Sequence, residues 1–188
     1  MRRGLLGGTF DPFHMVHLIA GELAARQLDL DVVTFLPAGE PWQKADRNIT
    51  PAADRWEMVT RSIGGVAYFE ADDREIRREG PSYTIDTLEE FADDDVVLIL
   101  GADAAAGLPT WHRSEEILER VSLAVLPRPG TTRADVADTG ARFDWLDAPE
   151  IPISSTMLRR RGADGLTIRF FVPDAAWHYC KEQGLYGQ

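Results

Sequence analysis

Cysteine is almost absent from this chain of 188 residues, and so are long apolar runs. The single Cys180 excludes an internal disulfide and any zinc site built from four cysteines. No apolar run approaches the roughly 18 residues that span a bilayer. The apolar stretch that follows Met1 is too short for a signal peptide. We therefore expect a cytoplasmic protein without a membrane segment.

Positive charge is also scarce. The 20 basic residues stand against 31 acidic ones, which leaves a net charge of −11. A chain of this sign lacks the basic surface of a general nucleic-acid binder, so we expect no nucleic-acid partner. Only Lys44 and Lys181 are lysines. The remaining basic residues are arginines, whose planar guanidinium suits two-point contacts with carboxylates and phosphates.

Apolar segments alternate with helical patterns along a chain of single-domain length. We expect strands ending at Gly8 and over 31–36, 66–69, 96–100, 123–126 and 143–146. We expect helices over 18–28, from Thr50-Pro51 onward, and over 86–91, 114–120, 155–161 and 174–183, with a polar loop over 130–142. The alternation predicts an α/β fold with a doubly wound parallel sheet, Rossmann-like, in one domain.

Ligands of such sheets bind beyond the carboxyl ends of the strands. The loops at that edge are 7–17, 37–48, 101–112 and 127–130. In the first loop, two glycines let backbone N–H groups approach an anion, and the helix that follows directs its positive end to the same point. His14 and His17 are three residues apart and would share one helix face. The pattern predicts a phosphate site.

Two other interpretations of the first loop stay open on these residues alone. A glycine turn followed by two surface histidines would look the same, and a histidine pair can also hold a metal ion. The chain contains neither a Walker loop nor a complete GxGxxG fingerprint.

The first loop, Gly7-Gly8-Thr9-Phe10-Asp11-Pro12-Phe13-His14-Met15-Val16-His17, resembles the GGTFDPxHxGH signature of the HxGH nucleotidyltransferases. That superfamily comprises adenylyl- and cytidylyltransferases. The resemblance implies that ATP phosphates are held by the turn and both histidines, namely Gly8, Thr9, Phe10, His14 and His17. Val16 replaces the glycine of the signature, which in the family lies close to the base and sugar of the nucleotide.

A second motif lies near the end of the chain. Ile153-Ser154-Ser155-Thr156-Met157-Leu158-Arg159 resembles the ISSTxIR motif of the same superfamily, although alone it also fits a capped helix with a solvated basic end. The resemblance implies that Ser155, Thr156 and Arg159 hold the distal end of the triphosphate. The C-terminal helices, about 154–188, would then complete the ATP site within the single domain.

Further segments resemble those of bacterial nicotinate-mononucleotide adenylyltransferases. They are 37–44 (PxxxPxxK), 82–88 (SYTxDTL), 101–103 with Trp111 (GAD…W) and 128–130 (RPG). The resemblance implies that the pyridine mononucleotide is held by Lys44, Tyr83, Thr84, Asp103, Trp111 and Arg128. Trp111 would stack on the pyridine ring, and the backbone at Tyr83 and Thr84 would receive its carboxylate. Taken singly, Trp111 also fits core packing, and Asp103 fits a helix cap.

The resemblance covers the chain from Gly4 to Tyr186 and implies adenylyl transfer from ATP to nicotinic acid mononucleotide. The products would be nicotinic acid adenine dinucleotide and pyrophosphate, in NAD biosynthesis. His17 would stabilise charge on the α-phosphate, with His14 beside it. Mg²⁺ would travel with the ATP phosphates rather than in a protein site.

Two alternatives to this function stay open. One is a nucleotide-binding relative with weak or no turnover because of Val16, and the other is an adenylyltransferase for another phosphorylated acceptor. The sequence also allows a homo-oligomer.

Overall fold

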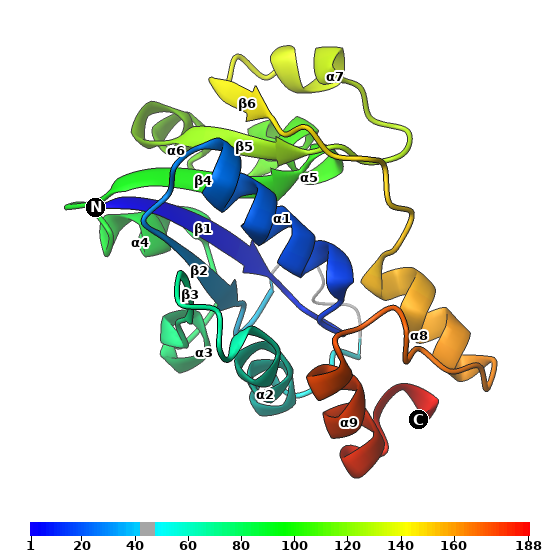
Figure 1. Cartoon of the computed structure of the whole chain (residues 1–188). Coiled ribbons are helices and arrows are strands. Elements are labelled where there is room, and N and C mark those ends of the chain that lie inside the picture. The colour runs from blue at the N-terminus through cyan, green and yellow to red at the C-terminus, as the bar shows by residue number, and fades with distance from the viewer. Residues whose placement is uncertain (42–47) are drawn as a thin grey trace.

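The computed structural model describes residues 1–41 and 48–188. At its centre lies a six-stranded sheet in the order β3-β2-β1-β4-β5-β6, and each neighbouring pair is parallel. Figure 1 shows helices packed on both faces of this sheet. The predicted doubly wound α/β fold is confirmed.

The strands are β1 (Arg2–Gly8), β2 (Val32–Pro37), β3 (Phe69–Ala71), β4 (Asp95–Gly101), β5 (Ser122–Leu126) and β6 (Phe143–Trp145). The helices are α1 (Met15–Gln27), α2 (Ala52–Ile63), α3 (Arg74–Arg77), α4 (Thr84–Glu89), α5 (Ala102–Ala106), α6 (Ser114–Arg120), α7 (Arg133–Ala137), α8 (Ser155–Ala163) and α9 (Asp174–Gln183), with short 3₁₀ turns η2 (Leu108–Thr110) and η3 (Leu185–Gly187). None of the described helices is long and apolar enough to cross a membrane.

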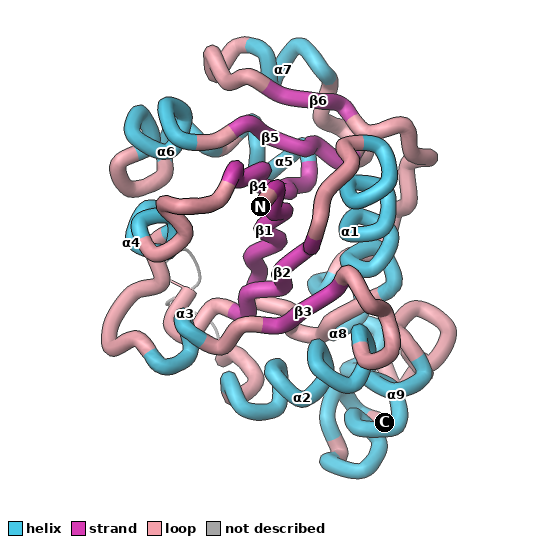
Figure 2. Tube along the Cα trace, turned by 60° about the vertical axis from the view of Figure 1, so that its left-hand side comes forward, coloured by secondary structure: helices cyan, strands magenta, loops and turns pink. Residues whose placement is uncertain are grey.

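The two faces of the sheet carry separate cores, because successive side chains of a strand point to opposite sides. Leu6 of β1 packs with buried residues of α1, α2, α8 and α9, whereas its neighbour Leu5 packs with those of α4, α5, α6 and α7. Figure 2 shows α4 and α6 on one side of the strands and α1 on the other. Since β1 pairs with both β2 and β4, the strand order reverses at the carboxyl end of β1.

Several strand and helix boundaries differ from the predicted ones by a few residues, the short helices α3 and α5 are not predicted, and two of the differences have a clear local cause. The third strand is Phe69–Ala71 rather than 66–69, because Val66 and Phe69 make the turn bonds that follow α2 (Val66 N to Ile63 O, 3.1 Å; Phe69 N to Val66 O, 3.0 Å). The second helix begins at Ala52 because Pro51 keeps an extended ψ of 142° and serves as the N-cap. Proline thus directly precedes the first helical residue.

The prediction of a loop over 130–142 is wrong. This segment contains α7, which begins after Thr132. The Thr132 side chain accepts a hydrogen bond from the Asp135 N–H, and Asp135 accepts one in return from the Thr132 N–H. This capping box, together with burial of Val136, stabilises a helix in an otherwise polar stretch.

Candidate active site

The turn after β1 brings the two predicted histidines together. His14 is the N-cap of α1, with extended backbone (φ −144°, ψ 169°), and His17 lies in the first helical turn. Their rings stack with centroids 3.7 Å apart and planes 20° from parallel. The histidines are therefore neighbours, as the spacing predicts, although His14 precedes the helix instead of sharing its face.

The orientation of His17 is fixed by its neighbours. Its Nδ1 accepts a hydrogen bond from the His14 backbone N–H at 3.0 Å. The ring also stacks on Phe13 at 5.1 Å and meets the Phe10 ring edge-on at 4.9 Å. In a neutral imidazole with Nδ1 as acceptor, the proton resides on Nε2. Nε2 of His17 is thereby assigned as a hydrogen-bond donor.

His14 is neutral and lies deeper. Its side chain is buried, and burial, followed by the nearby Arg128 charge, lowers its pKa from 6.5 to about 3. Among the described residues, its Nδ1 has no hydrogen-bond partner. An unsatisfied buried nitrogen at this turn is costly unless a ligand or water completes it.

Two cavities, each of about 230 Å³, meet at this turn. Their walls share Gly7, Gly8 and Thr9. Leu5 lines one cavity and Leu6 the other, so they lie on opposite faces of β1. A Cβ on Gly8 would lie 2.9 Å from the Phe10 ring, whereas one on Gly7 would point into open space. Gly7 thus leaves room in the cavity walls, and Gly8 permits the tight turn.

We call the cavity lined by Leu6 the His17 cavity, after the histidine in its wall. It is also lined by Phe10, Val16, Asp103, Arg128 and Ser155. Asp103 and Arg128 converge over Gly101, since a Cβ there would lie 2.8 Å from Asp103 Oδ1 and 3.1 Å from Arg128 Nε. That Nε is buried without a described partner. The resemblance assigns both side chains to the pyridine mononucleotide, and in the structure they line the same cavity as His17.

Helix α8 is anchored on the β1 turn through residues of the second motif. Ser155 Oγ donates to the Pro12 carbonyl at 3.0 Å, and Arg159 Nη1 donates to the Asp11 carbonyl at 2.6 Å. Arg159 also donates to Thr156 Oγ1 at 3.2 Å, and its Nη1 lies 3.9 Å from the Asp11 carboxylate. Ser155 alone of the three lines the His17 cavity.

The chain's last turn reaches the same place. The hydroxyl of Tyr186 donates to the buried Asp11 carboxylate at 2.6 Å. Burial and this hydrogen bond raise the pKa of Tyr186, so its hydroxyl keeps its proton. Asp11 therefore links the β1 turn to both C-terminal elements, α8 and η3.

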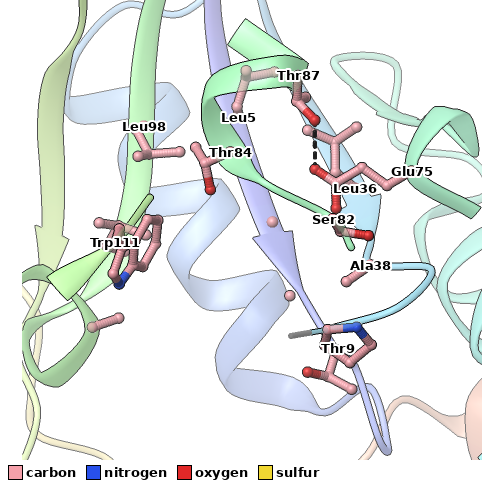
Figure 3. A pocket seen from close by; sticks show the side chains of 15 residues that line it. Leu5, Thr9, Leu36, Ala38, Glu75, Ser82, Thr84, Thr87, Leu98 and Trp111 are labelled. Carbon is pink, nitrogen blue, oxygen red and sulfur yellow. Dashed lines mark hydrogen bonds between the residues drawn. The ribbon is translucent and has the colours of Figure 1, made fainter. Parts of the chain in front are cut away.

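We call the other cavity, which is lined by Leu5, the Trp111 cavity. Figure 3 shows Trp111 and Thr84 on one side of it and Ala38, Ser82 and Glu75 on the other. The loop after β2 is tied to the segment before α4, because the Gly39 N–H donates to Ser82 Oγ and the Ser82 N–H donates to the Glu40 carbonyl, each at 3.0 Å.

Of the predicted mononucleotide residues, Thr84 and Trp111 line the Trp111 cavity. Tyr83 is the N-cap of α4, and its ring packs on His112 at 4.3 Å rather than lining either cavity. Lys44 lies outside the described residues.

Two buried residues with ionisable side chains, one in the wall of the site and one behind it, are not predicted from the sequence. Glu75 lines the Trp111 cavity, and burial raises its pKa. Thr87 Oγ1 donates to its carboxyl at 2.7 Å. Arg55 of α2 is among the largest fully buried side chains. Neither residue belongs to a pattern that distinguishes it from the exposed glutamates and arginines around it.

No protein metal site is apparent in the described part of the chain, where no three His, Cys, Asp or Glu side chains gather as a metal-binding group. The polar groups that line the His17 cavity include the backbone of the β1 turn, His17 and Arg128. That donor set suits the oxygens of a nucleotide.

The chain is similar to known nucleotidyltransferases over nearly its whole length. The cytidylyltransferase-like family model matches residues 5–161. A protein of Dehalococcoides mccartyi named probable nicotinate-nucleotide adenylyltransferase is 40% identical, across 99% of this chain and 97% of its own. A protein of the same name from Acidothermus cellulolyticus is also 40% identical, across 98% of this chain and 94% of its own.

The fold is also found among solved structures. The nicotinic acid mononucleotide adenylyltransferase of Plasmodium falciparum complexed with NaAD matches with a TM-score of 0.85 at 16% identity, covering 98% of this chain and 97% of that one. The same enzyme complexed with APC matches with a TM-score of 0.79 at 15% identity, covering 98% and 96%. On the strength of the family model and the curated relatives, this chain belongs to the nicotinate-nucleotide adenylyltransferases of the cytidylyltransferase-like family.

Proposed function

We propose that this protein transfers the adenylyl group of ATP to nicotinic acid mononucleotide, a step of NAD biosynthesis. Relatives that are 36–40% identical carry the name of that activity. The observation that carries the proposal is the pair of cavities that share the Gly7-Gly8-Thr9 turn. ATP would occupy the His17 cavity and the mononucleotide the Trp111 cavity. Their phosphates would then meet at the common wall.

The chemistry needs little from the protein beyond placement and charge stabilisation. A phosphate oxygen of the mononucleotide attacks the α-phosphorus of ATP, the bond to the β-phosphate oxygen breaks, and pyrophosphate leaves. The nucleophile is already ionised, so no strong general base is required. Nε2–H of His17 would donate to an α-phosphate oxygen, and N–H groups of the Gly8–Phe10 turn would hold neighbouring oxygens.

Further residues are assigned to ATP by their position. Arg128 Nε, a buried donor without a described partner, would reach a phosphate or the sugar together with Asp103. Ser155, Thr156 and Arg159 would hold the distal phosphates, so that the helices from about 154 to 188 complete the ATP site. Mg²⁺ would arrive with ATP, as part of the substrate.

The pyridine end is assigned to the Trp111 cavity. Trp111 would stack on the pyridine ring, and the backbone at Tyr83 and Thr84 would receive the carboxylate. Lys44, in a segment outside the described residues, stays a predicted phosphate contact.

The two alternatives receive no support from the comparisons. Val16 lines the His17 cavity, so a steric effect on the nucleotide has a place to act. The names of the relatives, however, describe an adenylyltransferase whose acceptor is the nicotinate nucleotide.

The test is a turnover assay with the purified protein. ATP is mixed in parallel with nicotinic acid mononucleotide, with its amide counterpart, and with 4′-phosphopantetheine as an unrelated phosphorylated acceptor. Pyrophosphate release and the dinucleotide product are both measured. We expect turnover with the acid mononucleotide and slower turnover with the amide. ATP binding without pyrophosphate release would contradict the proposal, as would preference for the unrelated acceptor.

Val16→Gly separates the steric question from the identity of the reaction. If Val16 narrows the nucleotide site, the variant should bind ATP more tightly than the parent. Equal ATP affinity in the two proteins would show that Val16 leaves the nucleotide enough room.

A further inference from the structure

Arg55 is an unusual side chain for the interior of a protein. It projects from α2 and is 1% exposed. Arginine is seldom fully buried unless it is paired. Among the described residues, no carboxylate lies within ion-pair distance of its guanidinium. Burial lowers its pKa, yet a guanidinium keeps its proton in proteins.

Backbone carbonyls take the place of a carboxylate. Nη1 donates to the carbonyls of Thr9 at 2.8 Å and Ala38 at 2.6 Å. Nη2 donates to the Gly39 carbonyl at 3.2 Å, and Nε donates to the Thr50 carbonyl at 2.9 Å. One planar group thus binds three separate segments: the turn after β1, the loop after β2 and the residue before the N-cap of α2.

Two of these segments form the walls of the candidate site. Thr9 lines both cavities, and Ala38 lines the Trp111 cavity. A single nitrogen, Nη1, bridges their carbonyls and so helps to set the spacing between the β1 turn and the β2 loop. The Ala38 N–H also donates to the Gly8 carbonyl at 2.9 Å, which ties the same two segments a second time.

Stability alone is a poor reason for such a group. Removing a guanidinium from water is costly, and well-packed apolar residues often stabilise a core as well or better. What an apolar side chain cannot do is hold several carbonyls at set positions, because it has no fork of donors. A buried arginine whose partners among the described residues are backbone carbonyls, three of the four in the loops of the site, is therefore better explained by geometry.

We propose that Arg55 is a positioning residue for adenylyl transfer, which sets the distance between the β1 turn and the β2 loop so that the two substrates meet in line. This inference rests on the proposed function. Arg55 lines neither cavity and acts through the carbonyls of Thr9, Ala38 and Gly39. When Arg55 is substituted, each substrate keeps its own contacts with the protein. The position of one substrate relative to the other changes.

The expected effect is therefore on kcat rather than on KM. A displacement of about 1 Å between reacting groups costs on the order of 100-fold in rate. Arg55→Lys keeps the charge but lacks the planar fork, and we expect it to lose about that factor in kcat while KM for either substrate changes little. Arg61→Lys is the matched control, because Arg61 lies on the same helix, is exposed and pairs with Glu57 and Glu182.

Chemical rescue separates positioning from a merely structural role. Arg55→Ala leaves a hole lined by four carbonyls, which millimolar guanidinium should refill. Guanidinium should then restore kcat at temperatures well below the melting midpoint, and methylammonium at equal ionic strength should not. Hydrogen exchange adds a readout that does not need turnover. The Ala38 and Gly39 amides should exchange faster in Arg55→Lys than in the parent, and at the parent rate in Arg61→Lys.

The outcomes distinguish this inference from the proposed function. If neither the parent nor Arg61→Lys turns over, the proposed function is rejected. Amide exchange would still report whether Arg55 holds the β1 turn and the β2 loop together. Normal kcat in a less stable Arg55→Lys would overturn the positioning role. Failure of both Arg55 variants to fold would assign Arg55 to stability and likewise overturn it.

Discussion

The geometry of His17 allows its two ring nitrogens to be tested separately. Nδ1 has a structural task, because it accepts the His14 N–H at 3.0 Å at the start of α1. Nε2 carries the N–H that we propose to donate a hydrogen bond to the α-phosphate. An Asn side chain places its oxygen near the position of Nδ1, and a Gln side chain places its NH₂ near that of Nε2. His17→Asn thus keeps the acceptor and loses the donor, and His17→Gln does the reverse.

The magnitudes follow from these contacts. A donor that stabilises transition-state charge contributes about 2.7–4 kcal/mol, so His17→Asn should lower kcat about 10²- to 10³-fold. His17→Gln should lose less activity, but it leaves the His14 N–H unsatisfied, at a cost of about 1 kcal/mol in the free energy of unfolding. Both variants also lose the contacts that the imidazole makes with the rings of Phe10 and Phe13.

The assay pairs initial rates of pyrophosphate release with urea unfolding of each variant. We expect opposite ranking of the two variants, with Asn the more stable and Gln the more active. Near-normal kcat in His17→Asn would refute the donor role of Nε2. Equal stability of the two variants would refute the tautomer assignment.

Three more measurements test the site. Because the pKa of His14 falls from 6.5 to about 3 on folding, its contribution to stability is present above pH 6.5 and is lost as the pH falls toward 3. Between pH 7 and 5 that loss amounts to about 2 kcal/mol, which His14→Gln should remove from the pH dependence of unfolding and His178→Gln should not. Trp111→Ala should raise KM for the mononucleotide about 5- to 150-fold, the range for loss of one stacked ring, with KM for ATP unchanged; an equal effect on both substrates would place Trp111 in the core. Burial raises the pKa of Glu75, so the parent should lose stability as the pH rises past the ordinary range of a glutamate. Glu75→Gln should abolish that loss in pH-dependent melting and the exposed Glu79→Gln should retain it; a parallel profile in all three proteins would contradict the assignment.

The alternation of strands and helices was predictable because each buried strand is a short run of apolar residues. Val96-Val97-Leu98-Ile99-Leu100, for example, is bounded by acidic residues and Gly101. The polar segment around α7 was not, since its helix depends on one capping box and one buried valine. Local hydrogen bonds of this kind leave little trace in hydrophobic periodicity.

The site divides in the same way. The meeting of His14 and His17 at the β1 turn was predictable, because the glycines, the helix start and the three-residue spacing are all local features of the sequence. The partition of residues between cavities was not, because it depends on which face of the sheet each loop reaches. Asp103 and Arg128 follow different strands, β4 and β5, and only the fold brings them beside His17. Arg55 looks like any arginine of an amphipathic helix until its burial is known.

The carbonyl partners of three arginines have an electrostatic consequence. Several arginines of the described chain, such as Arg3, Arg61 and Arg113, form ion pairs with carboxylates, which weaken their field. Arg55, Arg128 and Arg159 donate instead to neutral backbone oxygens, and in the described part of the chain only Arg159 has a carboxylate, Asp11, within 4 Å.

Charge in this acidic molecule is thus distributed unevenly. Arg55 and Arg128, beside the β1 turn, have no described carboxylate within 4 Å, so their positive charge is compensated less than that of an arginine in an ion pair. A protein with a net charge of −11 can in this way present a local attractive potential to polyanionic substrates and repel them from the rest of its surface.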